Sequence, residues 1–74
     1  MSGFFYADMV SDRRVWRLDG PFATEEEARA ALPAAKSMAL DLVDIASFAM
    51  FGTMRTKTDR GPGCLTKKLR EAAK

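Results

Sequence analysis

Few side chains in this sequence are of the types that carry out reactions. The chain has one cysteine, Cys64, and no histidine, so the commonest general base and metal ligand is missing. Glu25, Glu26 and Glu27 are adjacent carboxylates, but at the predicted start of a helix such a run is typical of groups that oppose the helix dipole. We expect no catalytic residue, no metal site, no cofactor and no enzymatic activity.

The segment Gly61-Pro62-Gly63, followed by Lys67, is the only other candidate for chemistry. A phosphate-binding loop follows a strand at a fixed spacing and ends in a Lys-Ser/Thr pair, and this segment has neither feature.

A lone Cys64 cannot close an internal disulfide, which favours a reducing compartment. The start of the chain lacks a signal-peptide pattern, and the apolar stretch 46–54 is too short to span a membrane. We expect a cytoplasmic protein that does not enter the membrane.

The charges are divided unevenly along the chain. Residues 1–54 carry five basic and eight acidic side chains, a net charge of −3. Residues 55–74 carry seven basic and two acidic side chains, a net charge of +5. The sequence thus joins an acidic body to a basic C-terminal segment.

Two short segments at the start of the chain predict a β-hairpin. Residues 4–10 and 14–18 are rich in aromatic and β-branched side chains, and the polar residues 11–13 between them favour a turn. So short a connection forces antiparallel pairing. We expect the second strand to end at residues 19–21, where Gly20 can take a positive φ and Pro21 has no amide to donate.

A helix is predicted next, from Thr24 to about residue 43 or 44. Thr24 and Glu27 have the spacing of a capping box. The apolar face recurs with helical periodicity at Ala28, Ala31, Leu32, Ala35, Ala39 and Leu42. Pro33 lies inside this pattern, so we expect a kink or two short helices in series.

The rest of the chain predicts a third strand over residues 45–56, a loop over 57–63 and a short terminal helix from Cys64. The expected fold class is α+β: a three-stranded antiparallel sheet of order 2-1-3 with one kinked helix on one face, plus the short C-terminal helix. We assign residues 1–56 to the ββαβ domain and residues 57–74 to a basic loop and terminal helix.

Strand alternation divides the sheet side chains into two apolar sets. We expect one set to meet the helix: Phe5, Ala7, Met9, Trp16, Leu18, Phe48 and Met50. We expect the other set to face away from it: Phe4, Tyr6, Val10, Val15, Ala49 and Phe51. One helix covers only one face, so the second face needs the C-terminal segment through Leu65 and Leu69, a second copy of the chain, or a foreign partner.

The outward side of the predicted helix carries Leu40, about 130° from the centre of the apolar face at 100° per residue. Either the Pro33 kink rotates the second half of the helix and buries Leu40, or Leu40 contacts a partner.

A basic C-terminal segment is also compatible with nucleic-acid binding, because neutralising phosphates releases counterions. The side chains that would contribute are Arg55, Lys57, Arg60, Lys67, Lys68 and Arg70. Tyr6 or Phe51 could stack on bases. The acidic body argues against this alternative, in which the chain is a nucleic-acid-associated accessory or regulatory protein.

Four short motifs resemble those of short uncharacterised proteins of proteobacterial phages and integrative elements: WRLDGPF (residues 16–22), EA (27–28), ALP (31–33) and FGT (51–53). The resemblance implies a non-enzymatic binding protein of a mobile element, of the kind that includes anti-CRISPR inhibitors. Its partner would be a host CRISPR surveillance complex whose DNA-binding surface it occludes. The partner-binding residues would then be Glu25, Glu26, Leu40, Asp41, Asp44, Tyr6 and Phe51.

Overall fold

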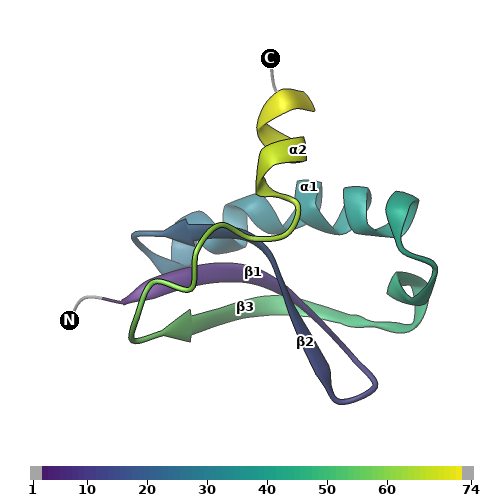
Figure 1. The fold of residues 1–74 in the computed structure, drawn as a ribbon, viewed down its shortest axis with the longest axis horizontal. Helices are drawn as coiled ribbons and strands as arrows, with labels where there is room; N and C mark the ends of the chain where they lie inside the picture. The colour runs from purple at the N-terminus through teal and green to yellow at the C-terminus, as the bar shows by residue number, and fades with distance from the viewer. Residues whose placement is uncertain (1–2, 73–74) are drawn as a thin grey trace.

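The computed structural model describes residues 3–72, except for the side chain of Ile45. Its elements are β1 (Phe4–Ser11), β2 (Arg14–Phe22), α1 (Glu25–Leu42), the 3-10 helix η1 (Asp44–Phe48), β3 (Met50–Thr56) and α2 (Thr66–Ala72). The three strands form one antiparallel sheet of order β2-β1-β3, with α1 packed against it (Figure 1). The predicted α+β class, strand order and C-terminal helix are confirmed. Residues 1, 2, 73 and 74, at the ends of the two predicted units, lie outside the described residues.

The β1–β2 hairpin turns on Asp12 and Arg13, which have φ values of 50° and 67°. Positive φ at both central residues matches the right-handed twist of the flanking strands. The predicted end of β2 at residues 19–21 is wrong, because β2 continues to Phe22. Pro21 is tolerated because β2 is an edge strand, and the pairing with β1 shifts register on this stretch.

The third strand is shorter than predicted. Residues 44–48 form η1 in place of the first part of the strand, and β3 begins at Met50. Local hydrogen bonds explain this: the Ala49 amide donates to the Ala46 carbonyl at 3.1 Å, and the Ser47 hydroxyl donates to the Asp44 carbonyl at 3.1 Å. Such local bonds give the backbone an alternative to the sheet.

The helix α1 is one element of 18 residues, so the alternative of two short helices is wrong. The Thr24 side chain accepts a hydrogen bond from the Glu27 amide at 3.2 Å, which confirms the predicted cap. Pro33 is exposed, so the amide bond it removes lies on the solvent side of a helix that packs elsewhere through small side chains. Leu42, predicted to lie on the packed face, is 54% exposed.

The core lies between the sheet and α1. Its buried cluster contains Ala7, Met9, Leu18, Ala35, Ala39, Ala46 and Leu65, with Leu69 packed against it. The buried residues of α1 are Ala28, Ala35 and Ala39, all from the predicted apolar face of the helix. Leu65 and Leu69 therefore fill the helix side, and the hypothesis that they cover the second face is wrong.

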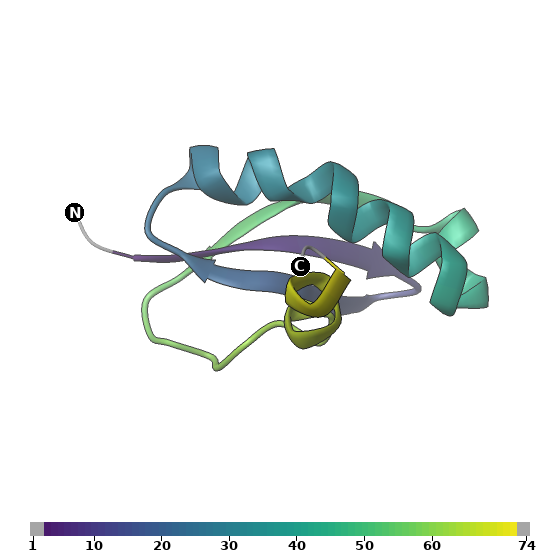
Figure 2. The ribbon, with the colours of Figure 1, turned by 90° about the horizontal axis from the view of Figure 1, so that it is seen from above.

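Residues 57–65, here called the return segment, cross the second face of the sheet instead. Figure 2 shows the sheet edge-on, with α1 on one side and this segment on the other. At its end the segment pairs with the free edge of β2: the amides of Gly63, Cys64 and Leu65 donate to the carbonyls of Gly20, Arg17 and Leu18 at 2.8–3.1 Å. The chain thereby closes one edge of its own sheet.

Candidate interaction surfaces

The large exposed apolar side chains gather at one end of the molecule. We call this region the apolar end; it consists of Val10, Val15 and Met50 on the sheet, Leu40 and Leu42 on α1, and Phe48 on η1. Phe48 and Met50 are 89% and 77% exposed. In both ribbon views the C-terminal end of α1, η1, the start of β3 and the β1–β2 turn lie at the same end (Figures 1 and 2).

Strand register makes part of the apolar end continuous. Val10 in the central strand pairs with Val15 on one side and with Met50 on the other. Residues opposite one another in neighbouring strands point to the same face, so these three side chains form a row across the sheet. The prediction that Met50 meets the helix is therefore wrong. The prediction that Phe48 meets the helix is also wrong, because Phe48 belongs to η1 and is almost fully exposed.

The acidic residues predicted to bind a partner fall into two separate groups. Asp41 and Asp44 are exposed at the apolar end, beside Leu40, which is 45% exposed. Glu25 and Glu26 are exposed at the opposite end of α1, about 24 Å away at 1.5 Å per residue. One compact contact can therefore include Asp41 and Asp44 with Leu40 but not the two glutamates.

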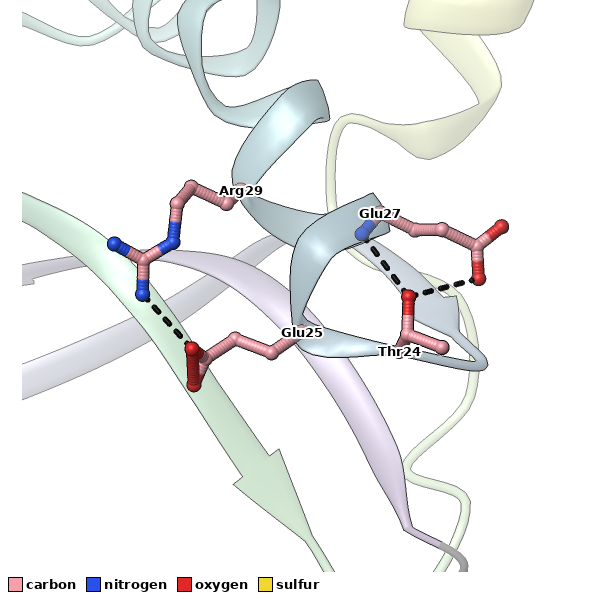
Figure 3. A network of polar contacts seen from close by, with 4 residues as sticks. All are labelled: Thr24, Glu25, Glu27 and Arg29. Atoms are coloured by element: carbon pink, nitrogen blue, oxygen red, sulfur yellow. Dashed lines mark hydrogen bonds and ion pairs between the residues drawn. The ribbon is translucent and has the colours of Figure 1, made fainter.

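Two of the three glutamates at the helix start, Glu25 and Glu27, make local contacts (Figure 3). Glu25 accepts a hydrogen bond from the Arg29 guanidinium at 2.8 Å, one turn further along α1. The Glu27 carboxylate accepts one from the Thr24 hydroxyl at 3.3 Å. These contacts agree with a capping role for this end of the helix.

The two aromatic side chains predicted to contact a partner are not available on an open sheet face. Tyr6 is fully buried beneath the return segment, where its hydroxyl donates to the Gly61 carbonyl at 2.8 Å and accepts from the Arg60 amide at 3.0 Å. Phe51 pairs with Met9 and packs on the helix side, with the Lys36 ammonium 5.3 Å from its ring centroid. The predicted phase of the third strand was therefore wrong by one residue, which exchanges its two faces.

The basic residues of the nucleic-acid alternative are all exposed but come from three elements. Arg55 lies on β3, Lys57 and Arg60 lie on the return segment, and α2 carries the others, Lys67, Lys68 and Arg70.

A hollow of about 250 Å³ lies between β2 and the return segment. Its lining residues are Val15, Trp16, Arg17, Arg60, Pro62 and Cys64. Sequence reasoning missed the meeting of Arg17 with Arg60 at this hollow. That meeting depends on the path of the return segment, and no local pattern predicts it.

Two titratable groups near this face have shifted pKa values. Burial raises the pKa of Asp8, which is 8% exposed, while hydrogen bonds from the backbone of Gly52 and of Asp8 itself oppose the shift. Cys64 is an exposed residue, yet desolvation of its thiol raises its pKa. Low-pKa thiols are the reactive ones, so this environment does not activate Cys64.

Within residues 3–72, no cluster of three or more Cys, Asp or Glu side chains has the geometry to hold a metal ion. None of the helices described has the length and apolar character needed to cross a bilayer. Comparison with protein-family models, with curated proteins and with solved structures gave no match. Functional inference for this chain therefore starts from its surfaces.

Proposed function

We propose that this chain is a non-enzymatic binding protein that docks on another protein through its apolar end. The exposure of Phe48 and Met50, at 89% and 77%, is the observation that carries this proposal. Covering a side chain of this size contributes about 1.5–3 kcal/mol. Exposed apolar side chains scattered singly need no explanation, but here six of them share one end of a small domain.

The charges beside the apolar end suggest the kind of protein that it binds. Asp41 lies between Leu40 and Leu42 in the sequence, Asp44 follows two residues later, and both carboxylates are exposed. An apolar centre bordered by carboxylates complements a partner surface that has an apolar pocket bordered by lysine and arginine. Surfaces that hold nucleic acid are of this basic kind.

The resemblance to phage and integrative-element proteins extends the proposal to a specific class of partner. In this form the chain is an anti-CRISPR inhibitor that acts in the host cytoplasm and occludes the DNA-binding surface of a CRISPR surveillance complex. Asp41 and Asp44 occupy positions that DNA phosphates would otherwise take, and Leu40 with Phe48 anchors the contact. Electrostatic attraction mainly speeds association, whereas the apolar anchor slows release.

Charge substitutions at the apolar end test the general proposal. Phe48→Glu with Met50→Glu places carboxylates where apolar contact is required, and Ala30→Glu adds a carboxylate at an exposed position elsewhere on α1. Against purified CRISPR surveillance complexes in surface plasmon resonance, we expect the double variant to lose binding and Ala30→Glu to keep it. Equal binding by both variants would contradict the proposal.

A competition experiment tests the specific form. Target DNA is added to the surveillance complex with and without this protein, and DNA binding is followed by gel shift. Asp41→Lys with Asp44→Lys is expected to restore DNA binding, while Glu25→Lys with Glu26→Lys, at the far end of α1, is expected to leave inhibition unchanged. If every surveillance complex tested binds DNA equally well with and without this protein, the chain is not an inhibitor of their DNA binding.

A homodimer is the alternative occupant of the apolar end. Sedimentation equilibrium separates it from a foreign partner: a dimer that Phe48→Glu with Met50→Glu converts to monomer would assign the surface to a second copy of the chain.

The nucleic-acid alternative must be tested with point substitutions. Deleting residues 64–74 would also remove Leu65 and Thr66, which are buried, so loss of binding by that truncated chain would report unfolding. Replacing Lys67, Lys68 and Arg70 together with glutamine removes the charge of α2 and leaves its buried residues in place. Loss of oligonucleotide binding by this variant would favour the alternative.

A further inference from the structure

We propose that the hollow between β2 and the return segment binds a phosphate group of a nucleic-acid strand, through Arg17 and Arg60. This site is separate from the apolar end, except for Val15 at its border, and it does not depend on the protein-binding proposal. Arg17 is half-buried and Arg60 is exposed, and both line the hollow.

The backbone around the two arginines is held by hydrogen bonds. The carbonyl of Arg17 accepts from the Cys64 amide at 2.8 Å, which fixes the return segment to the edge of β2. The Arg60 amide donates to the buried Tyr6 hydroxyl at 3.0 Å, which fixes the same segment to β1. Both arginines therefore project from anchored backbone, so binding of a ligand requires ordering of their side chains but not of the segments that carry them.

The carboxylates near the hollow accept hydrogen bonds from neutral groups, and within residues 3–72 none of them forms an ion pair with Arg17 or Arg60. Asp59 accepts from the Gly61 amide at 2.7 Å, and Asp19 accepts from the Thr66 hydroxyl at 2.8 Å. Asp8, the cross-strand partner of Arg17, accepts hydrogen bonds from backbone amides. The ion pair between Arg29 and Glu25 is the only one among residues 3–72.

Two arginines without a carboxylate partner at one hollow favour an anionic ligand. The guanidinium group donates in a planar fork that fits the oxygens of a phosphate better than an ammonium does. A buried or half-buried cation that lacks a partner is costly, and a phosphate would supply the missing charge.

Flanking basic side chains favour a strand over an isolated phosphate. Beyond Cys64 the first turn of α2 carries Lys67 and Lys68, both exposed. Basic groups thus continue beyond the hollow on its C-terminal side, where a further phosphate of the same strand would be bound.

Fluorescence anisotropy with labelled oligothymidylate at low salt tests the site. We expect Arg17→Gln and Arg60→Gln each to weaken binding about tenfold, the effect of losing one charge-assisted contact, and each to reduce the salt slope by about one. The matched control is Arg55→Gln, which removes an exposed arginine on β3 and is expected to weaken binding less than about twofold.

Three results would overturn the proposal. The first is absence of oligothymidylate binding by the unmodified chain, and the second is equal weakening by all three variants, which indicates diffuse charge. The third is binding of inorganic phosphate in calorimetry, lost in Arg60→Gln, without any binding of the oligonucleotide, which would make free phosphate the ligand. Arg60 is exposed, so its variant keeps the test valid even if Arg17→Gln fails to fold.

Discussion

The hydroxyl of Tyr6 donates a hydrogen bond to the carbonyl oxygen of Gly61 at 2.8 Å, although the two residues are 55 positions apart in the sequence. This bond joins the central strand to the return segment, and the Arg60 amide donates to the same hydroxyl at 3.0 Å. The second face of the sheet is closed at this point by the chain itself.

Tyr6→Phe is expected to lower the free energy of unfolding by about 1–2 kcal/mol, because it leaves the Arg60 amide and the Gly61 carbonyl without this partner. Urea denaturation measures the effect. Ser37→Ala, which removes a hydroxyl on exposed helix surface, is the control and should change stability by less than about 0.5 kcal/mol. Trypsin should also cleave Tyr6→Phe faster after Arg60. Unchanged stability and cleavage would show that the bond does not hold the segment in solution.

Gly63→Ala is expected to destabilise the fold by roughly 2–3 kcal/mol through overpacking. A Cβ at this position would lie 2.5 Å from the backbone of Leu18 and Asp19, atoms that cannot move aside without disturbing β2. Gly61→Ala is the contrasting variant: its φ is +80°, but nothing lies within 4 Å of the added Cβ. It should lose only about 1 kcal/mol from the left-handed backbone. Thermal melts of both variants should therefore rank Gly63→Ala lower, and the reverse order would contradict the pairing of residues 63–65 with β2.

Asp8→Asn is expected to stabilise the protein at neutral pH. Burial raises the pKa of Asp8 in the folded state above its ordinary value of 3.8, so the folded protein binds the proton more tightly than the unfolded chain does. Stability therefore falls as the pH rises from about the unfolded pKa through the folded one. The asparagine avoids this loss and still accepts from the Gly52 backbone. The melting temperatures of the two proteins should differ most near pH 7 and converge below 3.8; a difference independent of pH would contradict this account.

Cys64 is expected to react more slowly with iodoacetamide than a cysteine in an unfolded peptide at the same pH, because desolvation raises its thiol pKa and lowers the thiolate fraction. The rate should rise to the peptide value in urea. Oligothymidylate should slow the reaction further in the folded protein, because Cys64 lines the same hollow as Arg17 and Arg60. A thiol that reacts as fast folded as unfolded would show that its environment has no such effect.

The parts of this fold that the sequence predicts correctly depend on local chemistry. The hairpin follows from two β-rich segments around Asp12 and Arg13, and the helix start follows from the spacing of Thr24 and Glu27. With both faces of the third strand apolar, alternation alone could not determine which side meets α1. Phe51 was consequently placed on the wrong face.

The candidate sites were less predictable because they depend on long-range contacts. The structure keeps Leu40, Asp41 and Asp44 close to one another, because they are neighbours in the sequence at the C-terminal end of α1. Glu25 and Glu26 lie far from these three residues, because α1 is one continuous helix through Pro33 and they are at its other end. The hollow at Arg17 and Arg60 could not be predicted without the path of the return segment. The hydrogen bonds of that segment to Tyr6 and to the edge of β2 follow no periodic sequence pattern.

The order in which the chain is made gives the return segment a further consequence. During synthesis Tyr6 leaves the ribosome long before Arg60 and Gly61, so the face of the nascent sheet that contains Tyr6 stays exposed to solvent until the return segment has emerged. Until then the outer backbone groups of Arg17, Leu18 and Gly20 are open to any neighbouring strand. A prematurely terminated product would keep this edge bare and would be prone to aggregate.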